Sequence, residues 1–216
     1  TTQELGFATL KFNSVAAQMS RGKSEKTVAF AMSSVAATLA KFSMDVCLYM
    51  SQNFDFISLP AHLTTGSSIM PHKKNPDVFE LIRGKCNKIQ ALPYEITLIT
   101  NNLPSGYHRE FQLLKEGLFP AIQNLKACLD IAIFSIKDIK VKDNILADPK
   151  YNYLFTVDTL NEMVVAGMPF RDAYKAVAEQ LENGTYESPK ATQHTHEGSI
   201  NNLCLKEIKE KMQNAF

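Results

Sequence analysis

The sequence predicts an all-α fold, a bundle of long helices followed by a smaller helical domain. The stretch 24–53 contains neither Gly nor Pro. Two further stretches, 76–102 and a third that continues to about 137, repeat apolar residues at three- and four-residue spacing, which is typical of helices with one buried face. Long helices joined by short loops indicate an up-down bundle.

A change in composition after Ile136 predicts the domain boundary. The next residues are charged, and Asp148-Pro149 forms a turn signal. We therefore expect a central helical-bundle domain over 1–138, present only in part, and a small C-terminal helical domain over 139–216. In the second domain we expect helices over the ranges 156–166, 170–182 and 203–214.

The first long helix, 24–53, is apolar or small on nearly every side. A helix of roughly 25 residues is about 38 Å long. Because a helix that is apolar all round is buried on several sides, this one is expected in the middle of a bundle, one that subunits can share. The expected buried stripe comprises Val28, Met32, Val35, Leu39, Phe42, Val46 and Tyr49.

The next two helices have clearer stripes. The second is expected to begin at Pro76, with Pro93 kinking or dividing it. Its stripe comprises Phe79, Ile82, Cys86, Ile89 and Leu92. The stripe of the third comprises Leu118, Ile122, Leu125, Leu129, Ala132 and Ile136.

Charge and cysteine usage limit the function classes. The chain has 216 residues, a net charge of +1 and four widely spaced cysteines. No basic face is implied, so nucleic acid and anionic membranes are not expected partners. Without a C-x-x-C pair, a signal peptide or an apolar run of membrane length, the expected location is the reducing cytoplasm.

Residues 65–77 form the stretch with the most chemistry. Gly66 lets the backbone turn, and the hydroxyls of Ser67 and Ser68 follow directly. Ammonium and amide groups come five to eight residues later. These are Lys73, Lys74 and Asn75.

The end of this stretch resembles a helix start. Asn75 is expected at the N-cap, Pro76 at the first helical position and Asp77 in the first turn. Because free N–H groups and the helix dipole favour anions there, the loop is a candidate carboxylate or phosphate site. From residue types alone, an ordinary polar loop between helices explains it equally well.

The motif Gly-Ser-Ser-Ile-Met-Pro-x-Lys-x-Asn-Pro, which begins at Gly66, resembles the signature of the fumarase/aspartase superfamily. These enzymes break a C–N or C–O bond by elimination and release fumarate. Within the superfamily, 73–77 and 80–83 resemble argininosuccinate lyases. His72 departs from them, since many have Gln there, whereas adenylosuccinate lyases often have His; the latter remain an alternative.

A second segment carries the same resemblance. Tyr107, Gln112 and Lys115 match a Tyr/Gln/Lys-Glu pattern of argininosuccinate lyases that adenylosuccinate lyases lack. The resemblance implies that these side chains contact substrate, Tyr and Gln through neutral hydrogen bonds and Lys through a carboxylate. Without it they would be ordinary exposed helix residues.

The resemblance also implies roles in converting argininosuccinate to arginine and fumarate. Ser67 is the expected base, and Lys73 and Asn75 stabilise the developing charge on the substrate carboxylate. Glu80 holds the loop or Lys73, and Lys74 supplies helix-start charge. The implied catalytic residues are Ser67, Lys73, Asn75 and Glu80, and the implied substrate-binding residues are Ser68, Tyr107, Gln112 and Lys115.

No cofactor or metal is expected. His194 and His196, two apart with no third ligand nearby, are better explained as a polar loop. The resemblance implies a homotetramer whose sites each use three subunits. The family's N-terminal site segments, a Ser-x-Arg-Ser-Arg-Asn-Asp run and a Thr-His-x-Gln histidine, do not occur here. We therefore expect the C-terminal portion of an enzyme, inactive alone, with an inactive crystallin-like protein as the rival.

Overall fold

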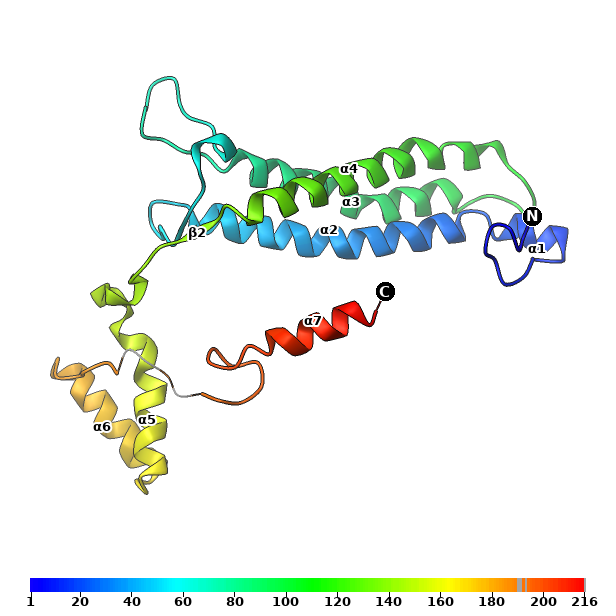
Figure 1. Cartoon of the computed structure of the whole chain (residues 1–216). Coiled ribbons are helices and arrows are strands. Elements are labelled where there is room, and N and C mark those ends of the chain that lie inside the picture. Colours follow the sequence, from blue (N-terminus) through cyan, green and yellow to red (C-terminus); the bar gives the residue numbers. More distant parts are fainter. Residues whose placement is uncertain (190–191, 193, 216) are drawn as a thin grey trace. The chain divides into compact units, whose positions relative to one another are not determined.

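The computed structural model describes residues 1–189, 192 and 194–215, and confirms the all-α prediction. A two-stranded sheet is the sole sheet in the described residues (Figure 1). The chain divides into two compact units, Thr1–Lys142 and Asp143–Phe216. The boundary between the two units follows Lys142, whereas the composition predicts a boundary after residue 138.

The first unit is a bundle of three long helices. These are α2 (Lys23–Tyr49), α3 (Asp77–Thr100) and α4 (Leu114–Ile136), which lie side by side (Figure 1). A short α1 (Ser14–Met19) precedes them. Of the two expected effects of Pro93, a kink or a division, the division does not occur, because α3 is helical on both sides of it.

Short elements close the two ends of the bundle. The strands β1 (Ile57–Ser58) and β2 (Lys140–Val141) pair antiparallel, so the chain after α2 meets the chain after α4. A 3₁₀ turn, η1 (Ala61–Leu63), leads into the loop before α3. Another, η2 (Arg109–Gln112), leads into α4.

The face that α2 buries differs from the predicted one. Val28 and Val35 are each 45% exposed, whereas Ala29 and Ala36 are fully buried. A helix that is apolar on all sides has no periodicity to select a face, and small side chains lie where helix backbones approach closest. The α2 residues buried here are Ala29, Met32, Ala36, Leu39, Ala40, Ser43 and Val46.

The stripe predicted for α3 is buried as expected, together with Pro93 and Ile96. The α3–α4 contact is close at Gly117, where a β-carbon would lie 2.9 Å from Leu92 Cδ1. Cys86 and Cys128 are both buried in the same core, with Cys86 on α3 and Cys128 on α4. Small side chains therefore allow α3 and α4 to pack tightly.

Two helical segments are long and apolar enough to cross a membrane, which differs from the expectation that no such run exists. They are Ser14–Tyr49 and Arg109–Ile136, and only 28% of each apolar window is buried within the described residues. Length and composition are weak evidence of membrane insertion, because core helices of bundles have the same properties. Both segments expose much apolar surface.

The second unit is built on a pair of helices. These are α5 (Thr156–Val165) and α6 (Phe170–Glu182), whose apolar residues pack against each other. The turns η3 (Ile145–Ala147) and η4 (Pro149–Phe155) precede them, and α7 (Leu205–Gln213) comes last and buries none of its residues.

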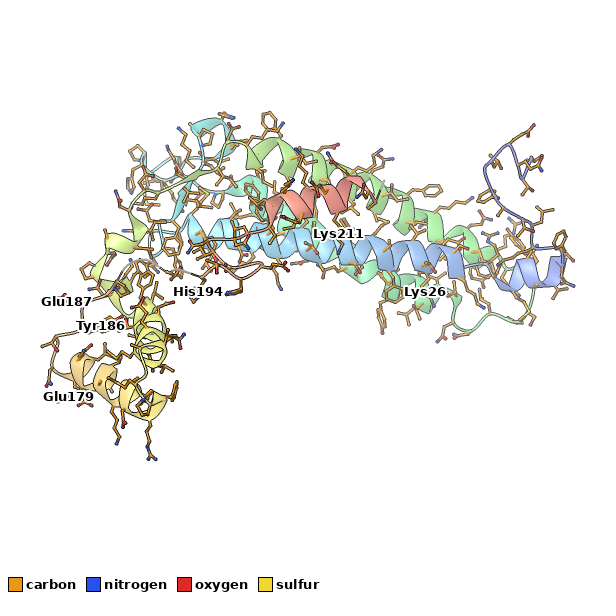
Figure 2. All side chains as sticks on the ribbon, turned by 60° about the horizontal axis from the view of Figure 1, so that its bottom comes forward. Lys26, Glu179, Tyr186, Glu187, His194 and Lys211 are labelled. Atoms are coloured by element: carbon orange, nitrogen blue, oxygen red, sulfur yellow. The ribbon has the colours of Figure 1, made fainter. Side chains whose placement is uncertain are left out.

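The chain after α6 is tied back to α5. The Tyr186 hydroxyl lies 3.0 Å from that of Thr159, and Tyr186 packs against the small core of the unit (Figure 2). His194 Nε2 lies 2.7 Å from Asp158 Oδ1. These contacts order the described part of the segment between α6 and α7.

Candidate active site

The loop before α3 is closed at its neck. Thr65 and Asn75 form an antiparallel bridge, with Thr65 N–H donating to the Asn75 carbonyl at 3.2 Å and Asn75 N–H donating to the Thr65 carbonyl at 2.9 Å. The Thr65 hydroxyl also hydrogen-bonds the Asp77 carboxylate on the first turn of α3. The nine residues 66–74 therefore project from a fixed base beside the helix start.

The hydroxyl oxygen of Ser67 accepts two backbone hydrogen bonds within this loop. The N–H groups of Ile69 and Met70 each donate to Ser67 Oγ at 3.2 Å. Hydrogen bonds donated to an oxygen favour its anionic form. Ser67 thus has a local environment suited to losing its proton, whereas Ser68 is exposed and has no comparable contact among the described residues.

The start of α3 differs by one residue from the predicted one. Pro76 is at the N-cap, α3 begins at Asp77, and no side chain caps the helix there. Asn75 uses its backbone in the neck bridge instead. Because Asp77 itself supplies a carboxylate at this helix end, the dipole alone does not make it an open anion site.

A pocket of about 700 Å³ lies between this loop and the C-terminal end of α2. Lys73, Asn75 and Glu80, three of the predicted catalytic residues, line it, together with His72 and Lys74. In the part of the chain that is described, Glu80 makes no ion pair with Lys73. The ammonium of Lys73 is exposed and available to an anionic ligand.

One thiol lines the same pocket. Burial raises the pKa of the Cys47 thiol, and Glu80 adds to the rise, while the nearby Arg83 acts in the opposite direction. A raised pKa keeps this thiol protonated at neutral pH. Cys47 is therefore a poor nucleophile.

The second predicted segment forms a hydrogen-bonded chain of three side chains. Gln112 Nε2 donates to the Tyr107 hydroxyl at 2.8 Å, and Lys115 Nζ donates to Gln112 Oε1 at 3.0 Å. Gln112 ends η2 and Lys115 lies in the first turn of α4. All three side chains are exposed, so the structure brings together a neutral and a cationic donor set at this end of the bundle.

The two predicted site segments do not meet within one chain. The loop 66–74 precedes α3, whereas Tyr107, Gln112 and Lys115 follow it, at the opposite end of the bundle (Figure 1). A helix of this length separates its ends by about 36 Å. The two predicted site segments, each of which we call a half-site, therefore lie at opposite ends of the bundle.

The histidines outside the loop have ordinary partners. His194 pairs with Asp158, and His62 Nε2 lies 3.7 Å from Asp138 Oδ2. Among the described residues, no group of three His, Cys, Asp or Glu side chains could hold a metal ion.

Sequence analysis missed the contacts that frame the two half-sites. At the loop these are Thr65 and Asp77, for which the available signal was a hydroxyl and a carboxylate on either side of the motif. At the other end, the guanidinium of Arg21 lies 5.4 Å from the centre of the Phe111 ring and 3.7 Å from Glu25 Oε1.

Comparisons with known proteins identify relatives of this chain. A lyase family matches residues 2–91. An argininosuccinate lyase from Parabacteroides distasonis is 56% identical over 216 residues, which is all of this chain and 48% of that protein. The chain thus spans about half the length of the curated relatives it matches.

Solved structures share the fold. A class II fumarase from Schistosoma mansoni has a TM-score of 0.69 at 20% identity, covering 94% of this chain and 41% of that one. A fumarate lyase:delta crystallin from Brucella melitensis has a TM-score of 0.67 at 20% identity, covering 85% and 41%. At this identity the likeness concerns the fold alone.

Proposed function

Since the chain belongs to the argininosuccinate lyase family, we propose that it is part of an enzyme that cleaves argininosuccinate to arginine and fumarate. The observation that carries the proposal is the loop 66–74, in which one short segment holds a hydroxyl in a donor-rich setting and an ammonium beside a pocket. Identity of 54–56% to relatives named argininosuccinate lyase favours this substrate over adenylosuccinate.

The elimination needs a base for a weakly acidic proton. Ser67 removes the proton from the carbon next to a substrate carboxylate, and the electron pair left behind forms the double bond of fumarate as the C–N bond breaks. The hydrogen bonds from Ile69 and Met70 N–H support the alkoxide that this step requires. The leaving guanidino nitrogen takes a proton from an acid that we do not assign within this chain.

Charge must be stabilised while the proton leaves. Lys73 and Asn75 lie on the loop arm that returns to α3, and both line the pocket. Their ammonium and amide can neutralise the extra negative charge on the substrate carboxylate, as donors in an oxyanion hole do. Glu80 lines the same pocket and is proposed to orient Lys73 when the loop closes on substrate.

We propose that the enzyme is a homotetramer that shares its sites between subunits. The half-site at Tyr107, Gln112 and Lys115 is about a helix length away from Ser67 in the same chain. The long helices also expose apolar side chains, including Val28, Val35, Phe119 and Phe134. Bundle-to-bundle packing between copies would cover these and bring the two half-sites of different subunits together.

In such a site Tyr107, Gln112, Lys115 and Ser68 bind the dicarboxylate substrate. The donor set suits this ligand, since Lys115 can pair with a carboxylate and the other groups offer neutral hydrogen bonds. The chemistry proposed needs no cofactor, and the expected location remains the cytoplasm.

A chimeric enzyme, which we call the transplant, tests the function directly. The chain replaces the matching 216 residues of the Parabacteroides distasonis relative, and fumarate release is followed by absorbance with argininosuccinate and, separately, adenylosuccinate. We expect turnover of argininosuccinate, its loss in Ser67→Ala with an unchanged circular dichroism spectrum, and no turnover by the chain alone.

Three other outcomes would favour a different substrate, a different class of protein or a different base. Turnover of adenylosuccinate in preference would support the second candidate, and a folded transplant with no activity would support the crystallin-like one. Activity retained in Ser67→Ala would assign the base to another residue.

A further inference from the structure

The neck of the loop joins Thr65, Asn75 and Asp77, and no proposed catalytic step uses Thr65 or Asp77 directly. The backbones of Thr65 and Asn75 exchange two hydrogen bonds, and the Thr65 side chain reaches the Asp77 carboxylate. One residue, Thr65, therefore holds both the returning arm of the loop and the first turn of α3. Its hydroxyl links residues that are twelve positions apart in sequence.

The Thr65–Asp77 contact lies close in sequence to two of the proposed catalytic residues. Ser67 is two residues beyond Thr65 on the outgoing arm, and Lys73 is two residues before Asn75 on the returning arm. Because both arms are joined at the neck, the separation of the Ser67 hydroxyl from the Lys73 ammonium depends on the neck being closed. A one-ångström error in such a separation is enough to cost a large part of the rate.

The Thr65–Asp77 contact is more than a routine helix cap. A cap residue directly precedes its helix and bonds the free N–H groups of the first turn. Thr65 instead lies on the far arm of the loop and bonds a side chain. Asp77 lies in the first turn of α3, where the helix dipole favours a carboxylate, so its side chain is a suitable acceptor for joining the loop to the helix.

We propose that Thr65 and Asp77 are positioning residues for the elimination, a clamp that fixes the base Ser67 relative to Lys73 and Asn75. The inference rests on the proposed function for its catalytic consequence, and on the neck contacts alone for its structural one. Thr65 and Asp77 touch neither substrate nor reacting atoms in this proposal.

The experiment compares Thr65→Val, which keeps the side-chain shape but removes the hydroxyl donor, with Thr65→Ser, which keeps the donor. In the active transplant, we expect Thr65→Val to lower kcat by about tenfold, since the lost hydrogen bond involves a charged group, with little change in KM. Thr65→Ser should restore most of kcat. Asp77→Asn should lower kcat as well.

A double-substitution cycle separates the clamp from general damage. If the hydroxyl and carboxylate act as a pair, Thr65→Val/Asp77→Asn should be no worse than the poorer single variant. The control is Thr97→Val, whose hydroxyl bonds only its own helix, at the Pro93 carbonyl 2.6 Å away, and which should leave kcat unchanged.

A second readout does not depend on activity. Amide hydrogen exchange of residues 65–75 in the chain itself should be faster in Thr65→Val and Asp77→Asn than in Thr97→Val, because the bridge opens more often. Unchanged exchange, or additive effects on kcat, would overturn the clamp. An inactive transplant with faster loop exchange would instead contradict the proposed function while supporting the clamp.

Discussion

Ser67 and Cys47 have different local surroundings, which affect how well each side chain could serve as a base. A serine hydroxyl is intrinsically a weaker acid than a thiol, yet Ser67 Oγ receives two N–H groups that favour its anion. Cys47 lines the neighbouring pocket, and burial raises the pKa of its thiol. The residue with the less acidic group is therefore the better candidate base.

The buried thiol of Cys86 leads to a prediction about how stability depends on pH. Burial first, and the neighbouring Cys128 second, raise the pKa of its thiol to about 12 in the folded chain. In the unfolded chain a cysteine thiol has a pKa of about 8.5, so above that pH the folded state binds more protons than the unfolded state. The stability from keeping Cys86 neutral is present below about pH 8.5 and lost as the pH rises towards 12.

We therefore expect the free energy of unfolding of the wild type to fall more steeply between pH 8 and 10.5 than that of Cys86→Ala, by up to about 1.4 kcal/mol per pH unit. Urea titrations at several pH values measure this. Cys204→Ala, at a half-exposed thiol, is the control for removing a cysteine. Equal slopes for Cys86→Ala and wild type would contradict the burial argument.

The packing of α3 against α4 depends on a small residue where the two helices meet. Gly117 lets α4 approach α3, since a β-carbon there would meet Leu92 Cδ1 at 2.9 Å and Glu95 Oε1 at 3.1 Å. Leu92 is buried and cannot move freely. By contrast, a β-carbon at Gly84 on α3 would have nothing within 4 Å.

This contrast gives a matched pair of substitutions. Gly117→Ala should destabilise the chain by about 1–3 kcal/mol through overpacking. Gly84→Ala should stabilise it by about 0.5–1 kcal/mol, because alanine restricts the unfolded chain and suits a helix. Thermal unfolding of both variants measures the difference. A stabilised Gly117→Ala would mean that α3 and α4 do not approach as closely as described.

For the whole molecule, the separation of the half-sites is the main consequence of the fold. Ser67 lies before α3 and Lys115 after it, so one bundle carries two incomplete sites. If copies share sites, a subunit defective at one end can still supply the other end. A monomeric enzyme could not do this.

Co-expression of two inactive variants tests the sharing. Ser67→Ala and Lys115→Ala, each in the active transplant, should have little activity separately, and mixed oligomers should regain part of it because some sites then contain neither substitution. Fumarate release by the co-purified mixture is the measurement. No recovery in oligomers shown to contain both variants would contradict shared sites, and two Ser67→Ala copies serve as the control.

How much was predictable depended on the element. The ranges 156–166 and 170–182 closely match α5 and α6, since turn residues marked their ends. The α3 stripe was correct because most side chains on the other sides of this helix are polar or charged. The α2 stripe was wrong at Val28 and Val35, because a helix apolar on every side contains no signal for the face that this bundle buries.

The sequence by itself determined the helical class, the motif with Ser67, Lys73 and Asn75, and the resemblance to argininosuccinate lyases, because periodicity and short motifs are local properties of a chain. Only the tertiary structure decided that Thr65 contacts Asp77, and that Tyr107, Gln112 and Lys115 lie a helix length away from Ser67. These contacts and distances depend on where the loops close and how the helices pack, and local sequence patterns do not specify either.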